Sequence, residues 1–339
     1  MTEATFASFR SLFFVRGRRG QRSKEHMSKI ETVRVGVAVA SILLGCVACV
    51  SAQDEQLLQE AGGALPTEES SPLLGTASGA GKSCAAVRCE HSKLNTQDAD
   101  PLGEGAWQLQ FNVGHSVSTR QWDSSGKEER RGRTYEWSNQ EVLTYGVSDD
   151  LDVGIGLGYA GLADDDAGLK SGHGLSDVAV SGKWRFFEKE ESGIGFAYVP
   201  TLTIPAGNDS TADRLGTSQE FWSVDTRFAV VKDWLNGWSA NLDVGYAAVL
   251  GDRGDSRGSL SANGAVGYHL LPWLQPEVEL NYGHDFIHDD RDADVVAITV
   301  GADAPISARV CARAGVQHGI AGRNADRTTT ILLSVDVNF

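Results

Sequence analysis

The 339-residue sequence has too little basic charge and too short an apolar run for several common classes of protein. Its formal net charge is −15. Residues 1–52 carry a net charge of +5, so residues 53–339 carry −20. This balance excludes a nucleic-acid partner, because phosphate binding requires a basic surface. The apolar stretch at 35–50 is also shorter than the ~20 residues that a membrane-spanning helix needs.

A common cofactor-binding motif is missing as well, since the sequence contains no P-loop. Cys84 and Cys89 have no second Cys/His pair at a zinc spacing, so we expect no metal and no cofactor. In an oxidising compartment these two cysteines predict either a local disulfide or two thiols.

The amino-terminal region predicts export. A basic stretch, an apolar stretch and the small-x-small sequence Val50-Ser51-Ala52 together indicate a secretory signal peptide at 27–52. We interpret residues 1–26 as the product of a start codon assigned too early. The alternative is lipidation, because 43–46 resembles a lipobox that would acylate Cys46. Residues 53–102 are rich in Gly, Ala, Ser, Glu and Pro, which predicts a flexible periplasmic linker.

The body of the chain, 103–339, is predicted to be all-β. Proline is scarce at 8 residues, whereas 39 glycines argue against helices. In 331–339 the odd positions are apolar and the even positions from Ser334 onward are polar, which indicates a strand with one apolar face. Similar runs predict about twelve strands, near 107–113, 133–147, 151–159, 178–186, 193–206, 222–230, 238–246, 258–270, 278–282, 292–304, 310–316 and 331–339.

The predicted connections alternate in length, which is typical of an outer-membrane barrel. Short turns are expected at 148–150, 188–192, 233–237, 271–273 and 304–306. Longer polar loops are expected at 119–132, 161–174, 207–217, 251–257, 285–291 and 318–327. The stretch 133–147 fits least well, because Asn139 and Glu141 interrupt its apolar face.

A soluble sandwich also shows alternating strands. Three features favour a membrane instead: charges of both signs on the polar face, aromatic residues at the strand ends and the need to pair every strand edge in lipid. We therefore predict a transmembrane antiparallel up-and-down β-barrel at 103–339, located in the outer membrane, with lipid around it. In a closed barrel the last strand must pair with the first, near Trp107.

The stretch Ser171 to Phe187, SGHGLSDVAVSGKWRFF, and the sequence Pro205-Ala206-Gly207 carry a resemblance to a known family. They resemble the outer-membrane transporter-like family named after the MetA pathway of phenol degradation. The family pattern G-x-G-D appears here as Gly172-His173-Gly174, with two additional residues before Asp177. The resemblance implies a barrel that passes small, aromatic or hydrophobic compounds. It also implies that Phe339 is the signal read by the barrel-assembly machinery.

Charged residues on the polar faces are the candidate lumen lining. Two lumens fit them: an open one with a transverse field that orients dipolar solutes, or one filled by mutual ion pairs. The basic candidates are Lys183, Arg185, Arg227, Arg309 and Arg313, and the acidic candidates are Asp225, Asp243, Glu277, Glu279 and Asp336.

Three functional hypotheses follow. The first is passive passage of small-molecule solutes, without enzymatic activity. The second is an enzyme at the extracellular rim that uses His284, Asp285 or His288 as an acid–base group. The third is a structural or adhesive surface barrel. The acidic stretch 163–167 fits either an ordinary solvated loop or a site that bridges divalent cations to lipopolysaccharide.

Overall fold

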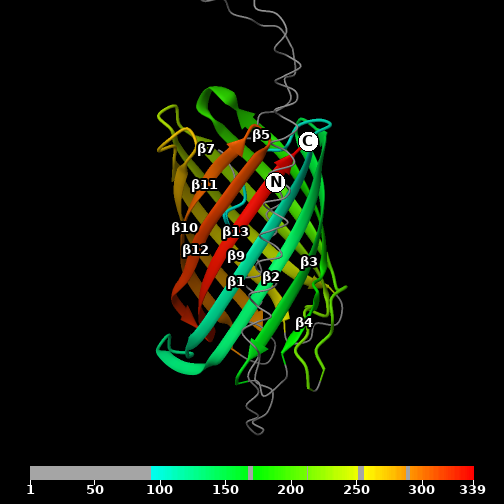
Figure 1. Ribbon diagram of the computed structural model, residues 1–339, viewed down its shortest axis with the longest axis vertical. Helices are drawn as coiled ribbons and strands as arrows, with labels where there is room; N and C mark the ends of the chain where they lie inside the picture. Colours follow the sequence, from blue (N-terminus) through cyan, green and yellow to red (C-terminus); the bar gives the residue numbers. More distant parts are fainter. Residues whose placement is uncertain (1–92, 167–170, 212, 251–255, 288–290) are drawn as a thin grey trace, which may run out of the picture. The chain divides into compact units, whose positions relative to one another are not determined.

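The computed structural model describes residues 93–166, 171–211, 213–250, 256–287 and 291–339. Within them, twelve long antiparallel strands close into a barrel, and one short strand, β4 (Gly172–Leu175), extends the sheet beside β3 (Figure 1). The predicted fold is confirmed. The long strands are β1 Trp107–Trp122, β2 Glu128–Ser148, β3 Leu151–Asp164, β5 Val178–Lys189, β6 Ile194–Ile204, β7 Trp222–Asp233, β8 Trp238–Leu250, β9 Ser256–Tyr268, β10 Gln275–Ile287, β11 Ala293–Ser307, β12 Val310–Arg323 and β13 Ala325–Asn338.

The ring closes between the first and last strands, as the sequence predicts. β1 pairs antiparallel with β13 in a ladder that runs from Gln108 opposite Asn338 to Trp122 opposite Ala325. The Phe339 N–H donates to the Trp107 carbonyl at 3.0 Å, which extends the ladder by one residue. Closure of this kind leaves no unpaired sheet edge, and an unpaired peptide group in hydrocarbon costs several kcal/mol.

The distribution of residue types is the reverse of that in a soluble domain. The buried residues are mostly polar or charged and face the lumen, for example Gln110, Asn263 and Glu279. The large apolar side chains are exposed on the outside, for example Leu157, Leu280 and Val300. No helix among the described residues is long and apolar enough to cross a membrane. The outward apolar belt therefore faces lipid, and the polar wall faces the interior.

Aromatic pairs mark both edges of the apolar belt. Trp107 and Tyr145 lie with their ring centroids 4.6 Å apart at the end that carries Phe339, and Trp137 stacks on Tyr159 at 5.6 Å further along β2. Between these pairs the side chains of Asn139 and Glu141 share the outward face, and the Asn139 amide donates to Glu141 at 3.0 Å. The poorest predicted strand is thus a full strand with one polar pair on its lipid side.

The two rims differ less in loop length than the sequence suggests. We take the rim beside Phe339 as periplasmic, because its turns are short. At the opposite, extracellular rim, the loops predicted at 119–132 and 318–327 are wrong. The hydrogen-bonded ladders of β1, β2, β12 and β13 continue through these polar residues. The connection at 205–221, between β6 and β7, is long.

The β1–β2 turn is held by one carboxylate. Asp123 accepts hydrogen bonds from the Ser125 hydroxyl at 2.7 Å, the Ser125 N–H at 2.8 Å and the Lys127 N–H at 2.9 Å. The hydrogen bond from the Ser125 side chain is the main reason that the pKa of Asp123 lies below its ordinary value. A five-residue turn therefore replaces the expected loop.

The glycine-rich motif holds the 205–221 connection against the wall. β3 pairs with β5 from Leu151 to Gly156 and with β4 from Tyr159 to Leu162. Asp177 accepts the N–H groups of Gly207 at 3.1 Å and Gln219 at 2.8 Å. A Cβ on Gly172 would lie 1.8 Å from the Leu215 carbonyl oxygen, so only glycine fits there. The role of this motif in the described residues is structural.

A charge on the lipid-facing side should destabilise the barrel. We expect Leu280→Arg to lower the free energy of unfolding by about 2–4 kcal/mol, because the guanidinium would enter hydrocarbon. The matched control is Leu235→Arg in the fully exposed periplasmic turn, where the change should be below about 1 kcal/mol. Denaturant titration in lipid vesicles measures both, and equal effects of the two substitutions would contradict the assigned lipid face.

Candidate functional site: a lumen with an internal strap

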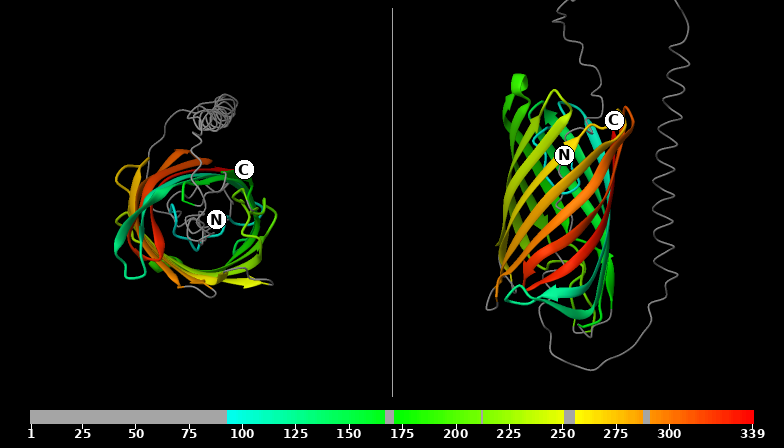
Figure 2. Two further views of the ribbon diagram at one scale, coloured as in Figure 1. Left: turned by 90° about the horizontal axis from the view of Figure 1, so that it is seen from below. Right: turned by 90° about the vertical axis from the view of Figure 1, so that its left-hand side faces the viewer.

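A short segment of the chain lies inside the barrel. We call residues 93–102 the strap; Figure 2 shows it within the ring of strands. Residues 93–99 are buried, and the segment joins β1 through the glycines at 103 and 105. The linker was predicted over 53–102. Its last ten residues are instead packed in the lumen, while 53–92, like the predicted signal peptide and Cys46, Cys84 and Cys89, lie outside the described residues.

Carboxylates of the wall accept the backbone N–H groups at the first half of the strap. Glu277 accepts the Leu94 N–H at 3.2 Å, and both oxygens of Glu279 lie 3.0 Å from the Asn95 N–H. Asp243 accepts the Gln97 N–H at 2.7 Å. Hydrogen bonds to a charged acceptor are stronger than neutral ones, which offsets the loss of water around these peptide groups.

The second half of the strap is held by cations and by one more carboxylate. The Lys183 ammonium forms an ion pair with Asp98 and donates to the Asp100 carbonyl at 3.0 Å. The Arg185 guanidinium lies 3.7 Å from the Asp100 carboxylate. Asp152 accepts the Leu102 N–H at 3.0 Å. Polar contacts to β10, β8, β5 and β3 thus fix the strap around much of the inner wall.

Apolar contacts complete the attachment. Ala99 is fully buried in a cluster with Ala197, Val199, Ala229 and Val231, which form an apolar patch on β6 and β7. On the far side of the lumen, Leu94 lies over two glycines of β11 and β12. A Cβ added to Gly301 or Gly315 would come within 2.3 Å of the Leu94 Cδ1 atom. The wall is therefore recessed where the strap side chains enter.

Ion pairs between wall residues surround the strap. Arg227 contacts Asp243 at 2.5 Å and Asp225 at 3.2 Å. Arg313 contacts Asp336 at 2.5 Å. These pairs place opposite charges side by side on β7 and β8 and on β12 and β13, so Arg227 and Arg313 do not form a basic stripe separate from the acidic candidates.

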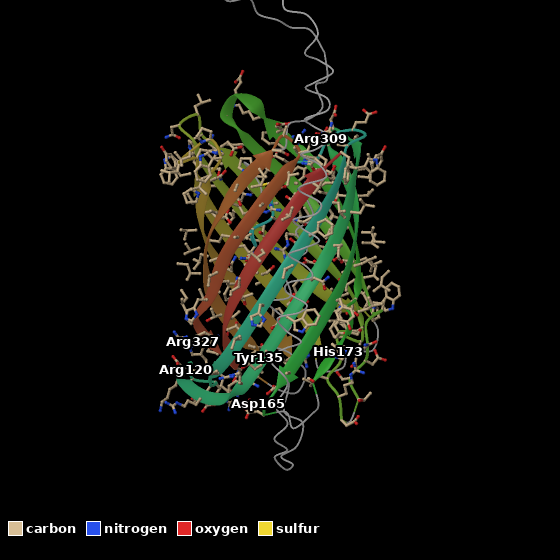
Figure 3. All side chains as sticks on the ribbon, in the orientation of Figure 1. Arg120, Tyr135, Asp165, His173, Arg309 and Arg327 are labelled. Carbon is tan, nitrogen blue, oxygen red and sulfur yellow. The ribbon has the colours of Figure 1, made fainter. Side chains whose placement is uncertain are left out.

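Nine of the ten candidate lumen residues lie on the inner side of the barrel. Lys183, Arg227, Asp243, Glu277, Glu279, Arg313 and Asp336 are buried there, and Arg185 and Asp225 are partly exposed. Arg309 is the correction: it is exposed in the turn between β11 and β12 at the periplasmic rim (Figure 3). β11 continues to Ser307, so the turn lies at 308–309 instead of the predicted 304–306, and this places Arg309 outside the strand.

The suggested acid–base residues at the extracellular rim do not face one another. His284 and Asp285 are neighbours in β10 and therefore point to opposite faces. His284 lies on the outside, with Nδ1 2.8 Å from Asp294, whereas Asp285 is buried inside. His288 lies outside the described residues. Among the residues that are described, no group of three His, Cys, Asp or Glu side chains is placed to hold a metal ion.

Cys311 forms a disulfide bond at the inner wall. It is buried on the lumen face of β12, two residues from Arg313. Its partner lies outside the described residues, because 93–339 contain no second cysteine.

The strap is the feature that sequence reasoning missed. Its composition continues that of the predicted linker, so it carries no strand or helix signal. A different signal was present: inward-facing carboxylates outnumber inward-facing cations. Glu277, Glu279, Asp303, Asp285 and Asp152 are buried in the wall beside the ion-paired acids. Such an excess of buried carboxylates requires hydrogen-bond donors from outside the wall, and the backbone N–H groups of the strap supply several of them.

Comparison with known proteins supports this architecture. Residues 108–335 match the family described as "Putative MetA-pathway of phenol degradation". The COG4313 outer membrane channel from Pseudomonas putida F1 is similar in structure, with a TM-score of 0.65 and 18% identity over 73% of this chain and 100% of that chain. The KdgM porin (TM-score 0.43, 9% identity, 68% of this chain and 99% of that one) and the translocator domain of the autotransporter NalP from Neisseria meningitidis (0.40, 10%, 71% and 91%) are more distant. No curated protein matches the sequence.

The buried pair between strap and wall should be essential for stability. We expect Lys183→Met to lower the free energy of unfolding by about 3–5 kcal/mol, because Asp98 stays buried without this cation. The double variant Lys183→Met/Asp98→Asn should recover part of that loss. Denaturant titration of the unmodified protein, the two single variants and the double variant measures the coupling, and additive effects of the two substitutions would contradict a direct pair.

Proposed function

The chain belongs to the family described as "Putative MetA-pathway of phenol degradation", and we propose that it is a channel for passive passage of small molecules across the outer membrane, where this barrel lies. One observation carries the proposal. The lumen accommodates a ten-residue polypeptide segment in addition to the side chains of its wall. A barrel with that much interior is wide enough for a small solute wherever the strap leaves room or moves aside.

The wall chemistry suits neutral or dipolar solutes better than ions of one sign. Arg227 and Arg313 are paired with carboxylates of the wall, and Glu277 and Glu279 of β10 accept hydrogen bonds from the strap. The apolar patch on β6 and β7 beneath Ala99 is the part of the wall that an aromatic or hydrophobic compound would contact. We propose small aromatic or hydrophobic molecules as the solutes, as the family resemblance implies.

Two further partners belong to the proposal. Phe339 follows β13 at the periplasmic rim and is exposed, which suits recognition by the barrel-assembly machinery. Lipopolysaccharide is the lipid expected around the extracellular half of the apolar belt. Export by the predicted signal peptide at 27–52 precedes both interactions.

Conductance tests the proposed function directly. The full-length protein, reconstituted in planar bilayers, should give discrete conductance steps, and proteoliposomes should swell in isosmotic solutions of small uncharged solutes. A barrel that stays silent and impermeable in both assays would overturn the proposal and favour a purely structural or adhesive role. A hydrolase or protease screen of the same preparation tests the alternative of an enzyme at the rim.

Loosening the strap should increase passage. We expect Glu277→Gln/Glu279→Gln to raise the population with a displaced strap by about tenfold, since each charged hydrogen bond lost contributes roughly 1 kcal/mol or more. Single-channel recording would show longer or larger openings. Glu141→Gln is the matched control, because this carboxylate faces lipid and should leave conductance unchanged.

A further inference from the structure

Three arginines lie on the outer face of the extracellular rim, where β1, β2, β12 and β13 end. We call them the rim cluster; it contains Arg120, Arg130 and Arg327, with Glu128 between two of the arginines and His318 beside Arg327. Figure 3 shows Arg120 and Arg327 at this rim, beside the β1–β2 hairpin. In a chain with a net charge of −15 such a concentration of positive charge is unusual.

The register places the cluster just beyond the lipid-facing belt. Along β13, Arg327 and Thr329 share the outward face with Ile331 and Leu333, both of which are exposed apolar residues. On β12, His318 follows the exposed Val316 on the same face, and its Nδ1 atom lies 2.8 Å from the Thr329 hydroxyl. On β13 the polar positions thus begin where the exposed apolar residues end, which is the depth of lipid headgroups.

The cluster carries more positive charge than its own carboxylate neutralises. Glu128 contacts Arg327 at 2.8 Å and also pairs with Arg120. The Arg327 guanidinium also contacts the His318 Nε2 atom at 3.1 Å. Arg130 is exposed and lies directly across the strand pair from Arg120, whose side chain is 52% exposed. Like charges at opposite positions repel each other, so three arginines and one carboxylate leave room for an anion.

We propose that the rim cluster binds the phosphate groups of lipopolysaccharide in the outer leaflet. Guanidinium groups match phosphate oxygens with paired hydrogen bonds, and three of them converge here. The acyl chains of the same lipid would lie on Ile331, Leu333 and Val316 directly below. This inference requires the barrel to lie in the outer membrane, but it does not depend on solute passage.

The neighbouring charges provide a built-in control. Arg323, one residue before the β12–β13 turn, is exposed at the same rim, and its guanidinium lies 2.5 Å from Asp294. This pair is locally neutral. Removal of the Arg323 charge therefore tests whether any arginine at the rim binds the lipid, or only the unbalanced cluster.

The experiment measures binding of the detergent-solubilised full-length protein to lipopolysaccharide with intact lipid A phosphates and to the same lipid after dephosphorylation. We expect Arg120→Gln/Arg130→Gln to weaken binding to the phosphorylated lipid about tenfold or more, because at least one charged hydrogen bond is lost. Arg323→Gln should bind as the unmodified protein does. Heat-modifiable gel migration confirms that each variant is folded.

Equal binding of the double variant and the unmodified protein would overturn the proposal, as would equal affinity for the dephosphorylated lipid. Competition by millimolar inorganic phosphate would show that the cluster is a general phosphate site, which contradicts the requirement for a lipid. The conductance of the double variant should equal that of the unmodified protein. A failed passage assay and a failed lipid assay are therefore distinguishable outcomes.

Discussion

Hydrocarbon cannot hydrogen-bond to a peptide group, and this constraint determines most of the structure. It requires a closed ring, so β1 and β13 must pair although they lie at opposite ends of the barrel sequence. It also puts apolar side chains outside and leaves polar ones for the lumen. Inside the barrel, buried carboxylates such as Glu279 and Asp243 then need hydrogen-bond donors. The backbone of the strap meets that need.

The strap and the wall are consequently one polar network. The carboxylates of β8 and β10 hold its first half through backbone N–H groups, and Lys183 holds its second half through Asp98. The apolar patch on β6 and β7 receives Ala99 between these two attachments. A solute that enters the lumen must bind to these polar groups or displace the strap from them. The same contacts therefore stabilise the barrel and limit its permeability.

Period-two alternation was enough to predict the strands and the lipid face, because both depend on a local pattern of apolar and polar residues. The closing pair followed instead from the need to pair every strand edge in lipid. The extended β1–β2 hairpin was missed because its ladder continues through polar residues such as Arg130, where alternation gives no signal. The inward direction of Lys183 and Glu279 followed from the pattern, but their partners did not. Those partners lie in the strap, whose contacts with β8 and β10 span more than 140 residues of sequence.

The position of the strap immediately before β1 has a consequence for biogenesis. β1 forms one side of the seam, and β13, which follows the other strands of the barrel in the sequence, forms the other. Before the seam is sealed the sheet is an open, curling ribbon, and residues 93–102 can reach its inner face from the side; afterwards they can reach it only through an end of the barrel. Because β10, β8, β5 and β3 all hold the strap, the order of these two steps decides how the interior is filled.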